Sequence, residues 1–591
     1  MSIIERITSL RDLMLEKGID AVLIYGTDPH LSEYVPDAWR SREWITGFTG
    51  SYGKVAITMN QAALWTDSRY FIQAEKQLAG SGILMIKDRQ ADTMAVDQWL
   101  MQQLKIGSTV AVDGLTISAS EAKLLEQKLG AKGITFDIKT DLVSPLWKDR
   151  PHLPQGEIFD YSVTFAGLGR QEKLALIRNR LAGLGASSTI ICQLDDLAWS
   201  FNLRGSDISY NPLFTGYGYV DQHKAILFIH DEKIPVGLIE ELDREGVDVI
   251  NYSSIISVLD NVLSSPVFID PDRTNFLLYR FIQERSNVIE GLAIPTLLKS
   301  VKNEVEQNGM REAHIRDGVA MVNFLHWLDN NSEKQKITEQ FIEEKLRSFR
   351  SEQLYFVGES FSSIVGFGPH GAIVHYSATA ESNLKILPDG ILLFDSGGQY
   401  LDGTTDLTRT IATGRVTDQQ QSDFTLVLKG MIQLAKAIFP ENTKGYSLDI
   451  LARKALWNCG LNYGHGTGHG IGHYLSVHEG PMAIRQEYNG EPIREGQILS
   501  DEPGIYREGE YGIRIENVLL CKREFKTDFG NFLSFETLTL CPIDTKLMKR
   551  QLLTSEETEW INYYHARVLN ELGPRLEPDV LRWLTVRCAP I

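Results

Sequence analysis

Apolar and polar positions in the first 120 residues follow two periods, one typical of helices and one of buried strands. In residues 3–17, Ile7, Leu10 and Met14 recur at helical spacing between charged residues, so we predict a helix there. After Gly18 the run at 21–25 is apolar throughout, and short runs at 62–66 and 109–113 predict further strands. Helices that alternate with strands predict an α/β architecture.

The same order recurs after a proline-rich connection. Residues 145–156 contain three prolines and a glycine, which favours an irregular linker. Beyond it, a helix is expected at 171–184 and a strand at 189–192. The repetition predicts a duplicated α/β domain.

A third and largest region follows. Ile315, Val319 and Val322 form a helical stripe, so a helix is predicted over 298–328. Near residue 540 the pattern changes to a helical tail, with Trp560 and Tyr564 among charged residues.

Composition narrows the class of protein. A length of 591 residues predicts about three or four domains. The 77 acidic against 59 basic residues give a net charge of −18, which argues against a general nucleic-acid binder. Five scattered cysteines without a CxxC pair argue against a disulfide framework. We expect no secretory leader and no membrane span, and therefore a cytoplasmic protein.

Two aspartates flank a predicted hairpin in residues 390–410. In a hairpin centred between Tyr400 and Leu401, Asp395 and Asp406 lie directly opposite each other on one face. Two bare carboxylates at that distance repel and raise a pKa, and a cation between them removes the cost. For this motif alone, two aspartates at turn edges are an equal alternative.

The histidines are crowded where chemistry is expected. Six of the 13 lie between residues 370 and 478: His370, His375, His465, His469, His473 and His478. Glycine at every second position from 464 to 472 defeats a helix, and an extended backbone puts His465, His469 and His473 on one face. We interpret the cluster as a metal site, against the alternative of a glycine-rich turn with incidental imidazoles.

Two further acids complete a candidate ligand set. Glu502 precedes a Pro-Gly turn, and a strand at 511–520 puts Arg514 and Glu516 on the face opposite Ile513 and Ile515. Taken singly, these read as a turn-edge acid and a surface ion pair. Together, four carboxylates and at least one imidazole suit Mn²⁺, Mg²⁺, Fe²⁺ or Co²⁺, with Zn²⁺ also accepted.

At these residues the chain resembles a known family. Asp395, Asp406, His469, Glu502 and Glu516 resemble the five metal ligands of the pita-bread metallopeptidases, which include methionine aminopeptidase, prolidase and aminopeptidase P. The text is most similar to the long, three-domain Xaa-Pro aminopeptidase branch of that family. The matching segments are 32–51, 64–71, 194–212, 362–377, 464–481, 500–506, 512–518, 533–543 and 560–568.

The resemblance implies a fold and a division of the chain. Two creatinase-like α/β domains occupy 1–155 and 156–300, an α+β pita-bread catalytic domain occupies 301–530, and a helical C-terminal extension occupies 531–591. It also implies one metal held by Asp395, Asp406 and Glu516, and another by Asp406, His469, Glu502 and Glu516. A hydroxide bridging the two metals is the implied nucleophile.

Further roles follow from the same resemblance. Glu502 is expected to shuttle the proton as general base and then acid. His375 and His478 match histidines that contact substrate, and His465 matches another catalytic histidine. Arg514 is expected to hold the ligand carboxylates, and Arg69 to contact substrate from the first domain. His473 receives no role, and His370 is expected to be a surface residue.

The implied activity is hydrolysis of the N-terminal peptide bond of peptides that carry proline in second position. Its cofactor is two divalent metal ions, manganese first, with zinc, cobalt or iron as alternatives. A cytoplasmic homodimer that binds peptides, and neither nucleic acid nor membrane, is expected. The competing hypotheses are a prolidase-like dipeptidase and a non-catalytic pita-bread binding protein.

Overall fold

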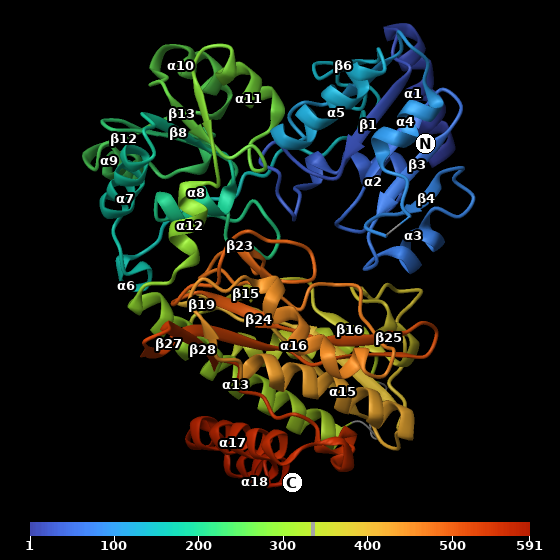
Figure 1. The fold of residues 1–591 in the computed structure, drawn as a ribbon, viewed down its shortest axis with the longest axis vertical. Helices are drawn as coiled ribbons and strands as arrows, with labels where there is room; N and C mark the ends of the chain where they lie inside the picture. The colour runs from blue at the N-terminus through green and yellow to red at the C-terminus, as the bar shows by residue number, and fades with distance from the viewer. Residues whose placement is uncertain (91, 332–336) are drawn as a thin grey trace. The chain divides into compact units, whose positions relative to one another are not determined.

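A computed structural model describes residues 1–90, 92–331 and 337–591 (Figure 1). The chain forms two compact units. Unit 1 contains Met1–Val163 and Leu168–Leu297, and unit 2 contains Thr164–Gly167 and Leu298–Ile591. Each unit is described separately below.

Unit 1 begins with the predicted helix and a six-stranded sheet. Helix α1 (Ile3–Lys17) starts at a Ser2 capping box and ends at Gly18 in the left-handed conformation. The sheet order is β4 (Leu84–Lys87), β3 (Ala62–Thr66), β2 (Lys54–Thr58), β1 (Ala21–Tyr25), β5 (Thr109–Val112) and β6 (Thr135–Asp137). The strands predicted at 21–25, 62–66 and 109–113 are confirmed to within one residue.

A second sheet in unit 1 repeats this topology. Its order is β12 (Val247–Asn251), β11 (Ala225–Ile229), β10 (Tyr217–Asp221), β8 (Ser188–Ile191), β13 (Val267–Ile269) and β14 (Val288–Glu290). In both sheets the central strand pairs antiparallel on one side and parallel on the other. The predicted duplication is confirmed.

Helices cover these sheets. In the first they include α4 (Val96–Gln103) and α5 (Ala119–Ala131), and in the second α7 (Arg170–Gly183), α8 (Leu194–Ser200), α9 (Val236–Arg244), α10 (Ile255–Val262) and α11 (Phe276–Gln283). Residues 145–156 contain neither helix nor strand, as predicted for a linker.

Unit 2 opens on a long helix that starts later than predicted. Helix α12 (Ile294–Ser300) ends before a break, and α13 runs over Glu304–Asn331. The side chain of Asn303 accepts the backbone N–H of Glu306 at 3.0 Å, which is the geometry of a helix N-cap. The prediction of one helix from 298 is therefore wrong at its start.

The strands of unit 2 form several sheets. One contains β16 (Ile364–Phe367), β17 (Ile391–Ser396) and β20 (Leu407–Ala412), and another contains β15 (Phe356–Glu359), β18 (Gly398–Tyr400) and β19 (Gly403–Thr404). The largest has the order β21 (Phe439–Pro440), β28 (Gly530–Thr537), β27 (Asn517–Thr527), β24 (Ile498–Asp501), β22 (Gly468–Gly470) and β23 (Glu479–Ile484). Strands β25 (Gly504–Arg507) and β26 (Tyr511–Arg514) form a hairpin.

One core joins these sheets to their helices. Apolar residues of α15 (Asp418–Ala435) and α16 (Gly445–Trp457) pack with Leu499, Leu519 and Ile513 of the strands. The predicted helical tail is confirmed as α17 (Ser555–Leu572) and α18 (Pro578–Arg587), and Ile561 and Leu584 extend the same core. Among the described residues, no helix combines the length and apolar character needed to cross a membrane.

Candidate metal centre

The hairpin that carries two of the candidate ligands has a different register from the predicted one. Asp395 of β17 pairs with Thr408 of β20, and the chain turns at Leu401 and Asp402 between β18 and β19. Asp406 is therefore not directly opposite Asp395. It is two residues from Thr408 and so shares the face of the sheet that Asp395 uses.

A close backbone contact at Gly397 holds the two arms of this hairpin together. A Cβ atom on Gly397 would lie only 2.0 Å from the carbonyl oxygen of Thr405. Only glycine allows the backbones to approach so closely. Gly397 lies two residues after Asp395, and Thr405 directly precedes Asp406. The contact therefore brings the two carboxylates close although they are not paired in register.

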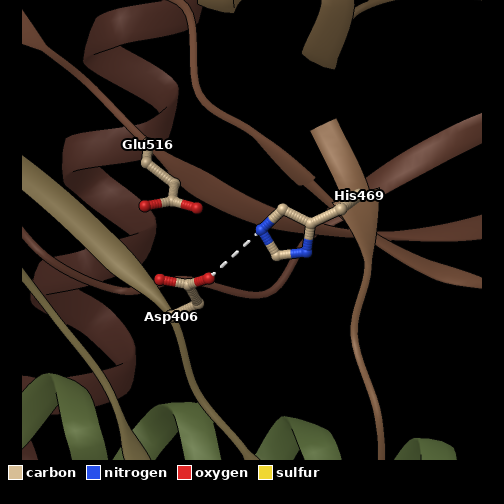
Figure 2. Close-up of side chains that lie close together, drawn as sticks. All are labelled: Asp406, His469 and Glu516. Carbon is tan, nitrogen blue, oxygen red and sulfur yellow. Dashed lines mark ion pairs between the residues drawn. The ribbon is translucent and has the colours of Figure 1, made fainter. Parts of the chain in front are cut away.

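Three side chains, from strand β22 and from the segments just before β20 and β27, converge on one point. Ligand atoms of Asp406, His469 and Glu516 all lie within 4.8 Å of one another, and Figure 2 shows the two carboxylates and the imidazole facing each other. The Nε2 atom of His469 lies 3.5 Å from Oδ2 of Asp406 and 3.5 Å from Oε1 of Glu502. The carboxylate of Glu502 is thus a fourth candidate ligand beside the same three groups.

The electrostatics of this cluster favour a cation. Burial, reinforced by the charges of Asp395 and Glu502, raises the pKa of Asp406 well above its ordinary value. Burial and the charge of Asp406 do the same to the pKa of Glu516. Burial raises the pKa of Glu502 to about 7, and the charge of Asp395 adds to the shift. Positive charge among these groups would relieve all three costs.

One carboxylate oxygen of Asp395 has a hydrogen-bond donor, and the other has none among the described residues. Arg514 Nη2 donates to its Oδ2 at 2.6 Å, while Oδ1 is buried with no hydrogen-bond partner in the described structure. A buried carboxylate oxygen without a donor is rare in a native fold. A divalent cation supplies the missing partner, so the donor set of oxygens and one imidazole fits such an ion.

The residues of the cluster differ in their exposure to solvent. Asp395, Asp406, Glu516 and Arg514 are buried, whereas Glu502 and the histidines His375, His465, His469 and His478 are half-buried. The ring of His478 lies 4.3 Å from that of His469, nearly perpendicular to it. The groups predicted to meet a substrate are therefore the more accessible ones.

Three polar residues around the centre were not predicted. Thr408 donates its hydroxyl to Glu516 Oε2 at 2.9 Å and accepts from Arg514 Nε at 3.1 Å. Ser500 donates to Glu502 Oε1 at 3.3 Å. Period-two spacing from Asp406 to Thr408, and from Ser500 to Glu502, was the available signal.

The third polar residue that was not predicted, Tyr506, lies between His465 and Arg514. The Nδ1 atom of His465 lies 2.7 Å from the carbonyl oxygen of Gly466, so it carries the proton and Nε2 acts as an acceptor. Nε2 lies 2.7 Å from the hydroxyl of Tyr506, which in turn accepts from Arg514 Nη1 at 2.7 Å. Tyr506 therefore donates to His465 and accepts from Arg514, so the chain of hydrogen bonds is directed from Arg514 through Tyr506 to His465.

His375 follows the short helix η4 (Gly368–Ala372), which is anchored from two sides. A Cβ atom on Gly512 of β26 would lie 1.7 Å from the carbonyl oxygen of Gly371, so the two backbones are in contact. On the other side, His370 Nδ1 lies 2.9 Å from Oε1 of the fully buried Glu339.

His370 is therefore not the surface residue that the sequence predicts. Its ring also lies 4.3 Å from that of Tyr376, whose hydroxyl donates to Glu339 at 3.0 Å. A buried carboxylate needs partners of this kind, and the local sequence around His370 does not reveal one 31 residues away.

His473 departs from the predicted common face. Strand β22 is only three residues long, and its register shifts between His469 and Gly470. The alternation of side chains therefore stops before His473, which is buried with Nε2 beside Gly309 of α13. Giving it no role in the centre agrees with this position.

Arg69 belongs to unit 1. Its guanidinium forms a pair of hydrogen bonds with Asp67, at 3.0 Å from Nε and 2.8 Å from Nη2. Its contact with substrate stays a prediction.

Four family models match the chain. Metallopeptidase family M24 matches residues 308–523, and the C-terminal region of peptidase M24 matches 531–591. The creatinase/prolidase N-terminal domain matches twice, at 6–142 and 149–306. The second match agrees with the repeated sheet of unit 1.

Curated relatives match over the full length. A probable Xaa-Pro aminopeptidase P of Paracoccidioides brasiliensis (strain Pb03) is 40% identical and covers 99% of both chains. That of Neosartorya fischeri is also 40% identical, over 99% of this chain and 92% of the relative.

Solved structures agree. An X-prolyl aminopeptidase from Caenorhabditis elegans, described as a cytosolic enzyme with a di-nuclear active site, superposes with a TM-score of 0.96 at 36% identity, covering 100% of both chains. A Bacillus anthracis Xaa-Pro dipeptidase shares the fold over 64% of this chain and 99% of its own, at 21% identity and a TM-score of 0.51. The chain therefore belongs to the Xaa-Pro aminopeptidase P family of M24 metallopeptidases.

Proposed function

We propose that this chain is a metal-dependent aminopeptidase that removes the first residue from peptides with proline in second position. The observation that carries the proposal is the convergence of Asp406, His469 and Glu516, bordered by Glu502. It is reinforced by Asp395, whose Oδ1 has no hydrogen-bond partner within the described parts of the chain. Full-length likeness to proteins named Xaa-Pro aminopeptidase P gives the substrate class.

The proposed ligands divide into two sets. Asp395, Asp406 and Glu516 hold one divalent ion, and Asp406, His469, Glu502 and Glu516 hold the other. When bound, the two ions lower the pKa of water and polarise a carbonyl oxygen. The C. elegans relative is described as having a di-nuclear active site, which supports two ions rather than one.

Glu502 is the proposed proton carrier. A carboxylate at this position can take a proton from water and return it to the leaving amine. Ser500 orients it through Oε1. A carboxylate that must change protonation state suits this half-buried position at the rim.

The half-buried histidines are proposed to meet the peptide. His375 and His478 contact the substrate and the developing oxyanion. His465, held in one tautomer by Gly466 and Tyr506, acts beside them. Arg69 is proposed as a contact from the first domain, within the division 1–155, 156–300, 301–530 and 531–591.

A dedicated site for penultimate proline is chemically reasonable. The bond to proline is a tertiary amide, and it offers no N–H to a site built for extended peptides. We further propose manganese as the native metal, with zinc, cobalt or iron as alternatives, and a cytoplasmic homodimer. The cytosolic description of the C. elegans relative supports the location.

The test is a comparison of three peptides. Purified protein with added Mn²⁺ is incubated with an Xaa-Pro-Xaa tripeptide, an Xaa-Ala-Xaa tripeptide and an Xaa-Pro dipeptide, and products are identified by mass spectrometry. The proposal predicts release of the first residue from the Xaa-Pro-Xaa peptide, with the alanine peptide cleaved far more slowly. Cleavage of the dipeptide alone would establish the prolidase-like alternative, and no cleavage would favour a binding protein.

A further inference from the structure

A buried arginine joins the strand of Asp406 to the residues around Glu516. Arg409 of β20 has almost no exposed surface. Its Nη1 donates to the carbonyl oxygens of Thr408 at 2.9 Å and Glu516 at 2.5 Å. Arg409 lies on the strand that follows Asp406, and its guanidinium binds the backbone of Glu516, so it connects the two candidate ligands.

The other end of the same guanidinium reaches the C-terminal extension. Nη2 donates to Asn517 Oδ1 at 2.9 Å, to the carbonyl oxygen of Cys541 at 2.8 Å and to the hydroxyl of Tyr564 at 2.9 Å. Tyr564 lies on α17, 155 residues from Arg409 in sequence. The planar fork of an arginine transmits the position of one end to the other.

The hydroxyl of Tyr564 is fixed by the segment before α17. It accepts the backbone N–H of Cys541 at 3.2 Å, and the carbonyl oxygens of Cys541 and Thr539 lie 2.9 and 3.1 Å away as acceptors for its proton. The ring stacks on Trp560 with 5° between the planes. Tyr564 is thus a rigid acceptor aimed at Arg409.

We propose that Tyr564 is a positioning residue of the metal centre, through which the C-terminal extension sets the place of the Glu516 backbone. The proposal rests on the ligand assignment given under the proposed function. Loss of the hydroxyl removes one acceptor that fixes the plane of Arg409 and leaves the buried N–H of Cys541 without its partner. Glu516 is then held less firmly where the metal ions require it.

The matched pair Tyr564→Phe and Tyr563→Phe tests this role. Tyr563 is the neighbour on the same helix and is 72% exposed. Metal-free protein is titrated with Co²⁺, and binding is followed by the visible absorption of the ion. We expect the dissociation constant to rise about 10-fold in Tyr564→Phe, in line with other partners that orient ligands, and to be unchanged in Tyr563→Phe.

A third variant separates positioning from a loosened helix. His565, also on α17, accepts the backbone N–H of Ile543 at 3.1 Å. His565→Ala is expected to lower the thermal midpoint of the metal-free protein while leaving the Co²⁺ dissociation constant within 2-fold of wild type. An equal rise in both α17 variants, or an unchanged constant in Tyr564→Phe, overturns the proposal.

The two claims fail separately. The ligand assignment fails if Asp406→Asn binds Co²⁺ as wild type does. The role of Tyr564 fails if Asp406→Asn loses the metal and Tyr564→Phe keeps it at the original affinity.

Discussion

Arg514 Nη2 lies 2.6 Å from Oδ2 of Asp395, while Oδ1 of the same carboxylate is buried and has no hydrogen-bond partner among the described residues. The arginine therefore fixes one oxygen of the carboxylate and leaves the other for a further ligand. It also donates to Tyr506 and Thr408, which connects both sides of the centre through one side chain. A planar group with several fixed donors suits this position.

Arg514→Lys is therefore expected to weaken metal binding. Lysine keeps the charge but cannot donate in three fixed directions at once. We expect metal affinity or turnover to fall about 10- to 100-fold, measured by metal titration and by a peptide assay. The control is Arg523→Lys. Arg523 lies on β27 and forms a half-exposed ion pair with Glu495, so this change should affect neither quantity. Wild-type affinity in Arg514→Lys would contradict the positioning role.

Glu502→Gln is expected to abolish turnover and leave the fold intact. The amide cannot accept and return a proton as the carboxylate does. Loss of a general acid–base group costs about 10²- to 10⁴-fold in rate. Circular dichroism checks the fold, and Glu510→Gln, at an exposed position of the following hairpin, is the control. Near-normal turnover in Glu502→Gln would defeat the role given to Glu502.

A buried ion network next to His478 predicts a stability effect. Glu479 forms ion pairs with Lys302 and, at 3.3 Å, with Lys299, and all three side chains are buried. Glu479→Gln removes the buried carboxylate that both ammonium groups contact, which costs about 3 to 5 kcal/mol. Denaturant unfolding measures the loss. The exposed Glu487→Gln should be neutral, and equal stability of the two variants would contradict this account.

His565 predicts how stability depends on pH. Burial, with the nearby charge of Arg409, lowers the pKa of this imidazole from 6.5 to about 4. Between these values the unfolded chain binds a proton that the folded chain does not, so stability falls as pH falls from 6.5 to 4. The contribution is about 3 kcal/mol from the size of the shift.

The variant His565→Gln isolates this contribution, because glutamine can keep an acceptor for Ile543 and does not titrate. Thermal midpoints of wild type and variant are compared at pH 7 and pH 4.5. The wild type should lose more stability than the variant on acidification. Parallel losses would show that His565 does not contribute.

Much of the fold follows from local patterns. The strands at 21–25 and 62–66 are buried at every position, because both faces of the sheet are covered, and apart from Thr66 they are apolar, so they are easy to recognise. The start of α13 was misplaced because the stripe of Ile315, Val319 and Val322 does not mark where the helix begins, which Asn303 determines as its N-cap.

The site was predictable where residue type and spacing carry the information. Asp395 and Asp406 were found, but their register was wrong because the turn lies at 401 and 402 rather than one residue earlier. Arg409, Tyr506 and Tyr564 were missed as parts of the centre. Their contacts join segments that are far apart in the chain, so no local period reveals them.

The central claim is that peptide cleavage depends on two metal ions held by this carboxylate cluster. The most direct measurement strips the protein with a chelator and adds divalent ions back in steps, while release of the first residue from an Xaa-Pro-Xaa peptide and bound metal per chain are recorded. The account predicts no cleavage without metal and full activity at about two ions per chain, by analogy with two-metal hydrolases. Equal cleavage by the metal-stripped protein would contradict it.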